Sequence, residues 1–438
     1  MNSLTQNKDT ANFLDAFKDF NGPGNGTLSG IRRDAIDSFS ALGFPTTGNE
    51  EWKYTNVAPI LKNTFHSASG TLTLSSDEIR PFCLTGKESI RLVFENGRFN
   101  QELSSIPEQS KGIIIANLAL HCDHPIAKEH LAKHASYKQA SFVALNTAFV
   151  NEGAFIYIPD NVVLEQEVHL MYVHDTRKTS VVVYPRNLIV TGKHSKVRIA
   201  ESSHSLGEVH QGLINSVTEI IMGENASVEF DKVQNENATS NHISHTEVLQ
   251  ARNSVFSICT VTLGGNMVRN NLHIQLLDEN CETHLNGLYI TQKNQHVDNH
   301  TLVDHAKPNC VSNELYKGIL DDQSQGVFNG KVFVRQDAQK TNAYQSNKNI
   351  LLSDDASINT KPQLEIFADD VKCSHGATTG KLDEEALFYL RSRGIGEKEA
   401  KAFLNIAFAA DVINKINIAG LRDRLMPLIE AKLNKTEN

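Results

Sequence analysis

The chain has 438 residues, with 42 basic and 51 acidic side chains and a formal net charge of -9 at pH 7. This length allows two or three structural units around a large buried core. The acidic balance argues against a nucleic-acid-binding surface. The first eight residues are polar, and nowhere do about eighteen apolar residues run together to cross a bilayer. We therefore expect a cytoplasmic protein that binds neither nucleic acid nor membrane.

The first part of the chain mixes helical and strand periodicities. We interpret residues 1–138 as a compact, mixed α/β domain. The patterns predict two amphipathic helices, two short strands and a further helix, at residues 10–20, 31–42, 90–94, 112–115 and 125–137 respectively.

After Ala140 the sequence becomes strongly β in character. Short apolar runs recur through residues 139–372, separated by Asn, Asp, Gly and Ser. A region of more than 200 residues with almost no helical periodicity fits either stacked β-sandwiches or a parallel β-helix that adds coil after coil. The repeat is too irregular for period counting to separate these two folds.

The last unit, residues 373–438, is predicted to be helical. Asp383 is a suitable N-cap, and Gly394 supplies a stop for that helix. An apolar stripe through Ala400, Phe403 and Ala407 predicts a buried face on the next helix. Helices on both sides of a β-helix would be expected to cap its two ends against edge-to-edge association.

Six cysteines are scattered without the spacing of a disulfide framework, so we expect free thiols. Cys259 and Cys310 are predicted to be buried and inert. Nine of the eighteen histidines lie between His204 and His305. Strand geometry does not bring them onto one face, which favours hydrogen-bonded or solvated surface histidines over a metal site.

The chain lacks a phosphate-binding loop of the Gly-x-x-x-x-Gly-Lys-Ser/Thr type, so we expect no ATPase activity of its own. A β-helix carbohydrate-active enzyme is the alternative function. Asp321-Asp322 and Asp354-Asp355 are its candidate acids, yet adjacent strand residues point to opposite faces, and the single Trp52 lies outside the β region. A self-associating structural protein is the third possibility.

Cys373 and His375 form the most informative pair of potential metal ligands. On an extended backbone both side chains leave the same face, about 7 Å apart. A tetrahedral zinc or iron centre needs about four donors, so the remaining ligands would come from elsewhere, such as another chain. By residue type alone, a structural thiol beside a polar histidine is the more frequent explanation.

The segment around this pair, Val371 to Gly394, resembles the C-terminal signature of the SufB/SufD family of iron–sulfur cluster assembly proteins. The motif Cys-Ser-His-Gly-Ala-Thr at residues 373–378 is similar to that of the SufD branch. Near the N-terminus, Glu50-Glu-Trp-Lys-Tyr-Thr55 looks like a second family motif, and the resemblance extends from about residue 40 to residue 425. Further matching motifs are Phe328-Asn-Gly-Lys331, Ala338-Gln-Lys-Thr341, Gln345-Ser-Asn347, Leu351-Leu-Ser353 and Lys361-Pro-Gln-Leu364.

The resemblance implies a mainly β fold, with a right-handed parallel β-helix core between the N-terminal and C-terminal units. It also implies a non-catalytic scaffold that pairs with SufB through the core and with the ATPase SufC through the C-terminal helices. By the same resemblance, His375 and Cys373 are candidate interface ligands for an Fe–S cluster shared with SufB. We expect no permanently bound cofactor, a transient iron–sulfur cluster on the complex, and reduced flavin or a homodimer as further options.

Overall fold

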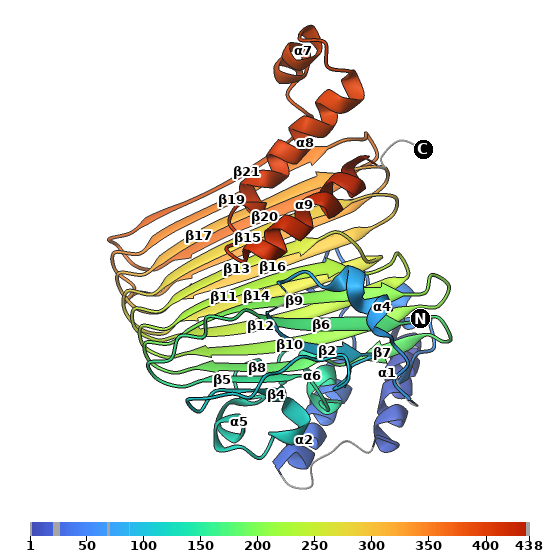
Figure 1. Ribbon diagram of the computed structural model, residues 1–438, viewed down its shortest axis with the longest axis vertical. Coiled ribbons are helices and arrows are strands. Elements are labelled where there is room, and N and C mark those ends of the chain that lie inside the picture. The colour runs from blue at the N-terminus through green and yellow to red at the C-terminus, as the bar shows by residue number, and fades with distance from the viewer. Residues whose placement is uncertain (1, 21–26, 68–70, 87, 435–438) are drawn as a thin grey trace.

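The computed structural model describes residues 2–20, 27–67, 71–86 and 88–434. Two long, mostly parallel sheets face each other and form a β-solenoid of about eight coils (Figure 1). Each coil gives one strand to each sheet, so consecutive strands alternate between the sheets. The predicted β-helix is confirmed.

The strands of the first sheet, in chain order, are β1 (His66–Ser67), β4 (Ile114–Asn117), β5 (Ala154–Ile158), β7 (Val181–Val183), β8 (Arg186–Thr191), β10 (Gly212–Met222), β12 (Ser240–Gln250), β14 (Met267–Leu276), β16 (His296–His305), β18 (Gln325–Val334) and β20 (Ser357–Ile366). Those of the second sheet are β2 (Ile90–Glu95), β3 (Arg98–Phe99), β6 (Val168–Asp175), β9 (Lys196–Leu206), β11 (Ser227–Asn235), β13 (Val255–Thr262), β15 (Glu282–Thr291), β17 (Val311–Leu320), β19 (Asn342–Leu351) and β21 (Lys372–Gly380).

Side-chain alternation along each strand builds the interior of the solenoid. Phe230, Phe256 and Ile274 point into the lumen between the two sheets and belong to one continuous buried cluster. The residues between them point outward, and most of these are also buried because helices cover both outer faces. Burial on both faces explains why the strand sequences show apolar runs and not a regular alternation of apolar and polar residues.

The coil corners explain why the repeat could not be counted. One residue per coil adopts a positive φ near 55–62° at the same edge of the solenoid, where the chain turns from one sheet to the other. These residues lie 27 to 33 residues apart, so coil length varies from coil to coil while the strand register is kept. The corner residues are Asn161, His194, Asn225, Asn253, Asn280, Asn309 and Lys340.

The N-terminal helices cover the outer face of the first sheet. Helices α1 (Asn2–Lys18) and α2 (Thr27–Leu42) confirm the two predicted amphipathic helices, and α6 (Ser141–Ala148) joins them. The sequence pattern does not indicate α6, because this short helix lies just after Ala140, where the sequence becomes β in character. Phe39 and Phe142 pack here against Leu213 of the sheet.

The predicted helix at 125–137 is shorter than expected. Helix α5 (Pro125–His130) ends because Ala132 takes a positive φ of 57°. The backbone N–H groups of Ala132, His134 and Ala135 then donate to the buried Glu219 carboxylate at 2.8–3.0 Å. An ionised carboxylate satisfied by three backbone donors stabilises this turn more than continued helix would.

Strands, and not helices, close the N-terminal end of the solenoid. Strand β2 pairs with β6, and β4 pairs antiparallel with β5. Phe99, Ile106 and Ile113 pack over the exposed end of the lumen core. The ladders therefore extend across both predicted domain divisions, since β2 and β4 precede residue 139 and β21 ends at Gly380. Short connecting segments are α3 (Ala58–Leu61), α4 (Ser76–Ile79) and the 3-10 turns Glu50–Trp52, Arg80–Phe82 and Leu118–Leu120.

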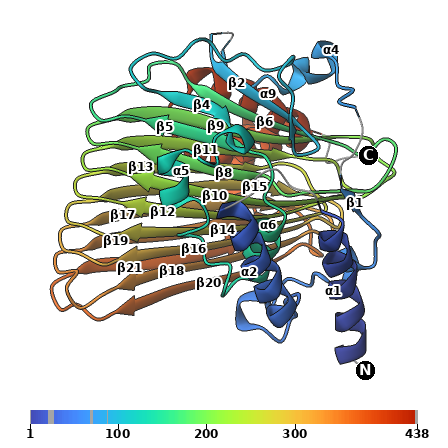
Figure 2. The ribbon, with the colours of Figure 1, turned by 90° about the horizontal axis from the view of Figure 1, so that it is seen from below.

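The C-terminal helices are α7 (Glu384–Ser392), α8 (Glu397–Ile413) and α9 (Ala419–Asn434). The Asp383 carboxylate accepts the N–H groups of Glu385 and Ala386, as predicted for an N-cap. Helix α9 and the second half of α8 cover the outer face of the second sheet, on a different side from the N-terminal helices (Figure 2). They do not cap the end of the solenoid, so the expectation of helical caps is wrong at both ends.

The predicted buried stripe on α8 is only partly right. Ala400 is buried, but Phe403 is 56% exposed and Ala407 is exposed as well. The first half of α8 projects past the solenoid together with α7 (Figure 1), and only the later residues, such as Val412 and Ile413, reach the sheet. Among the described residues, no helix has the length and apolar content needed to cross a membrane.

Arg186 and Glu219 form a fully buried ion pair at 2.6 Å between neighbouring coils. Replacing Arg186 by Met leaves the buried Glu219 carboxylate without its opposite charge, so we expect the free energy of unfolding to fall by about 3–5 kcal/mol. Lys193→Met, which breaks the exposed Lys193–Glu224 pair, should cost less than about 1 kcal/mol. Urea unfolding of both variants measures the difference; equal losses would contradict this assignment.

Candidate functional site at the open end of the solenoid

The last coil leaves one end of the solenoid uncovered. Strands β20 and β21 are the terminal strands of the two sheets, and β21 is exposed along almost its whole length. The N–H groups of Ser357 and Phe367 donate to the preceding coil. Backbone N–H and C=O groups point to alternate sides along a strand, so those of the even-numbered residues face the free edge of β20. Pro362 occupies one of these edge positions and has no N–H to donate.

Strand β21 places Cys373 and His375 on the same face, as the sequence spacing predicted. Their neighbours on β19 are Ala343 and Gln345, both buried in the lumen. Cys373 and His375 therefore continue the lumen face at the point where no further coil covers it. His375 is exposed there, whereas Cys373 is half-buried against an apolar cluster that includes Ala343.

The two candidate ligands differ in how readily they would bind a metal at neutral pH. Burial raises the pKa of the Cys373 thiol, and a backbone hydrogen bond from Ala343 only partly offsets this effect. A thiol with a raised pKa is a poorer nucleophile and metal ligand at neutral pH. The exposed imidazole of His375 is the better placed donor for a group arriving from outside.

A polar ladder leads inward from this end. Gln345 Nε2 donates to Glu314 Oε2 at 2.8 Å, and Thr301 Oγ1 donates to Glu314 Oε1 at 2.6 Å across the lumen. Glu314, Gln345 and His375 occupy matching positions on three successive strands. Burial raises the pKa of Glu314 to about 7, and its two hydrogen bonds moderate that shift.

Sequence reasoning did not find Glu314 or Thr301. In the sequence, Gln345 stands out only as part of a family motif. The available signal was the strand alternation in Asn313-Glu-Leu-Tyr-Lys317, which places Glu314 on the same face as Tyr316. An acidic residue on the buried face of a strand is uncommon and marks a site worth testing.

Several of the remaining histidines are hydrogen-bonded but buried rather than solvated, which corrects the surface assignment, and the buried His204 instead stacks on Phe82. His242 lies 2.6 Å from Glu236, and both are buried. His245 and His273 both contact the Glu247 carboxylate. No cluster of three or more His, Cys, Asp or Glu side chains in the described parts of the chain could hold a metal ion.

The candidate acids of the carbohydrate-enzyme alternative also have structural partners. Asp322 lies at a coil corner with a positive φ of 54° and accepts the N–H of Lys293. Asp354 pairs with Lys381 at 2.9 Å on the surface. Neither arrangement places two carboxylates across a sugar-binding groove.

Comparison with known proteins assigns nearly the whole chain. Residues 172–408 match the family model described as the SUF system FeS cluster assembly, SufBD core domain, and residues 13–170 match the SufBD protein N-terminal region. The chain belongs to the SufBD family. The family identity gives it a role in iron–sulfur cluster assembly.

Relatives in this family are similar to this chain over most of their lengths. A SufBD family protein of Synechocystis is 36% identical over 92% of this chain and 90% of its own length. The iron–sulfur cluster assembly protein SufD of Escherichia coli is 31% identical, covering 89% and 90% respectively. SufD of Bacillus subtilis is 27% identical, covering 93% and 94%.

The raised pKa of Glu314 predicts a pH dependence of stability. Between about pH 4.5 and pH 7 folded Glu314 keeps a proton that the unfolded chain has released, so the free energy of unfolding falls as pH rises. A shift of this size corresponds to about 3 kcal/mol. Glu314→Gln should remove this contribution, so that the variant gains stability relative to the parent between pH 5 and pH 8.

Urea unfolding at pH 5 and at pH 8 tests this prediction. Glu385→Gln, which removes an exposed carboxylate on α7, serves as the matched control and should leave the pH dependence unchanged. An identical pH dependence in Glu314→Gln and the parent would show that Glu314 does not titrate as described.

Proposed function

We propose that this protein is a non-catalytic scaffold subunit of the Suf complex, pairing with SufB and the ATPase SufC to build and transfer iron–sulfur clusters. The observation that carries the proposal is the exposed His375 on the uncovered last strand of the solenoid. The complex would act in the cytoplasm. The cluster is cargo and not a resident cofactor of this chain; reduced flavin on the complex is proposed without an assigned residue.

The open end is the proposed contact with SufB. Its free strand edges offer backbone donors and acceptors that a partner strand can satisfy. Cys373 and His375 cannot complete a metal centre alone, so the partner must bring further donors to the same place. Without SufB, the same edges could pair two copies of this chain as a homodimer.

A histidine at a shared interface suits temporary cluster binding. Neutral imidazole donates less electron density to iron than a thiolate does. Ligands divided between two chains can also be separated by movement of either chain. Assembly and release of the cargo would then use the same site.

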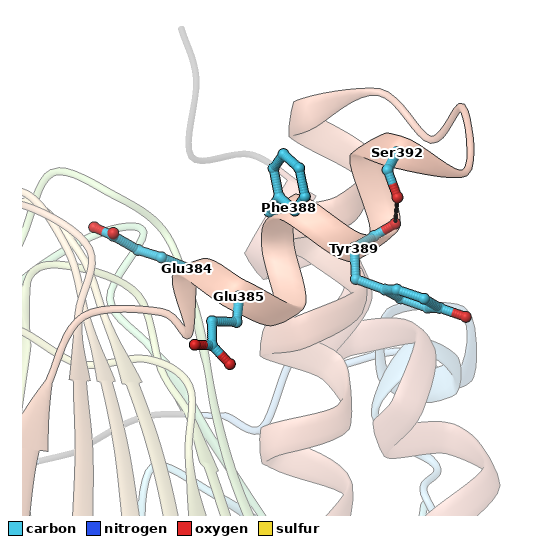
Figure 3. A pocket seen from close by; sticks show the side chains of 5 residues that line it. All are labelled: Glu384, Glu385, Phe388, Tyr389 and Ser392. Carbon is cyan, nitrogen blue, oxygen red and sulfur yellow. Dashed lines mark hydrogen bonds between the residues drawn. The ribbon is translucent and has the colours of Figure 1, made fainter.

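The projecting C-terminal helices are the proposed contact with SufC. Phe388 and Tyr389 of α7 are 74% and 58% exposed and point outward from one helix (Figure 3), and Phe403 of α8 is 56% exposed. Exposed aromatic side chains grouped on one projecting element are typical of a protein-binding surface. Glu384 and Glu385 add negative charge at the start of the same helix.

The structure offers a mechanical connection between this surface and the open end. Lys317 on the outer face of β17 contacts the Asp411 carboxylate at 2.5 Å and the Phe408 carbonyl at 3.0 Å, both on α8. Glu314 lies three residues earlier on the same strand, facing the lumen. Closure of two SufC subunits on ATP binding would pull on α8 and reshape the last coils.

Substituting His375 with Ala should abolish cluster accumulation on the complex while leaving subunit assembly and SufC ATPase activity intact. The measurement is iron and acid-labile sulfide per complex after anaerobic co-expression with SufB and SufC. His284→Ala, which removes a partly exposed imidazole from the outer face of the second sheet, is the control. Normal cluster content in His375→Ala would refute the proposed role of this residue.

The double variant Phe388→Ser, Tyr389→Ser should lose SufC without loss of SufB. None of the α7 residues is buried, so the fold should be unaffected. The subunit ratio after affinity purification on this chain gives the result. Val209→Ser changes a side chain that is 83% exposed in a distant loop and should retain SufC; retention of SufC by the double variant would place the contact elsewhere.

A further inference from the structure

We propose that Gln345 is a positioning residue for His375: its side-chain carbonyl accepts the N–H of one imidazole nitrogen, which leaves the other nitrogen facing out of the open end toward the iron cargo. This inference rests on the proposed function of His375. It adds two residues of this chain, Gln345 and its anchor Glu314, to a site that was defined by Cys373 and His375 alone.

The strand register places the two side chains next to each other. Gln345 of β19 and His375 of β21 are direct partners in a parallel pair. Neighbouring strands lie about 4.8 Å apart, and paired residues in a parallel ladder point to the same face. The lumen face of β19 is identified by Gln345 itself, which is only 3% exposed and bonds to Glu314 inside the solenoid.

The Gln345 amide has one end bound and one end free. Its Nε2 donates to the Glu314 carboxyl group at 2.8 Å, which fixes the amide plane. Its Oε1 is buried and has no hydrogen-bond partner among the described residues. An unpaired buried carbonyl is costly. The exposed side chain of His375 does not bond to it in the orientation described, but rotation of that side chain would bring an imidazole N–H to this acceptor.

The opposite wall of the lumen is adapted to this arrangement. Gly330 of β18 faces Gln345, and a Cβ at that position would lie 2.3 Å from Gln345 Nε2. The backbone at Gly330 has no positive φ, so the need for glycine there comes from space and not from conformation. Glu314 is itself held by Thr301, so the series from Thr301 to Gln345 is fixed before His375 is reached.

This chemistry matches a common feature of metal-binding histidines. A ligating imidazole usually donates its second ring N–H to a carboxylate or carbonyl, which fixes the tautomer and orients the ring. Loss of such a partner typically lowers metal affinity 10- to 100-fold. An unsupported, exposed histidine would instead sample both tautomers and several rotamers.

The test uses Gln345→Met, which keeps the side-chain length but removes both the carbonyl oxygen and the NH2 group of the amide. The full chain is labelled with ring-15N histidine, and the His375 signals are assigned by their loss in His375→Ala. In the parent these signals should show one dominant tautomer. Gln345→Met should show averaged nitrogen shifts. Gly330→Ala displaces the Gln345 amide without removing any polar group, so it should also average the nitrogen shifts. Agreement between the two variants would show that the result does not come from a folding defect in Gln345→Met.

The second readout is iron and sulfide on the complex with SufB and SufC. Gln345→Met should retain the parental subunit ratio and hold about tenfold less iron. Gln363→Met is the matched control, since it removes a glutamine from the outer face of β20, where its amide bonds to Asn329. That variant should retain both the His375 tautomer and the iron content.

The outcomes separate this inference from the function on which it rests. An unchanged tautomer in both Gln345→Met and Gly330→Ala overturns the inference, and so does parental iron content in Gln345→Met when His375→Ala has lost its iron. Normal iron content in His375→Ala overturns the proposed function itself, and with it the need for a positioning residue.

Discussion

The unsatisfied edge of the last coil is the constraint on which the rest of this structure depends. In a parallel solenoid each coil bonds to the next, so the terminal coil always leaves unpaired backbone groups. At the N-terminal end, the chain covers the lumen with β2, β4 and the apolar residues between them. At the other end the edges remain free, and the candidate ligand His375 lies there. The proposed function uses the end that the chain itself does not close.

Polar residues lie inside the lumen along the solenoid and continue to the open end. The early coils enclose the buried Glu201–Lys232 pair and Asn187 among apolar side chains, and the last ones enclose Glu314, Gln345 and the hydrogen-bonded amides of Asn347 and Asn349. Such networks are stable only when nearly every member has a partner. The free carbonyl of Gln345 is the point at which this network continues outward, beyond the last complete coil.

The sequence predicted the architecture better than its details. Apolar runs identified strands such as β6 and β10, and the N-cap at Asp383 was correct because capping is a local interaction. The apolar signal is weakest at β12, β16 and β19, because Asn, Ser, Thr and His occupy many of their lumen positions. Cys373 and His375 could be paired by spacing alone. Their neighbour Gln345 could not, because that contact depends on a register between strands 30 residues apart.

Pro362 has a consequence for how molecules of this shape assemble. Its ring lies where the outer edge of β20 would otherwise offer an N–H, so a strand added to the first sheet meets a gap in the bonding pattern. The opposite end offers no matching open coil, because antiparallel strands already cover it. Copies of this chain therefore cannot stack head to tail into a continuous fibre. An open solenoid end, ordinarily an aggregation hazard, is thereby limited to a single finite partnership.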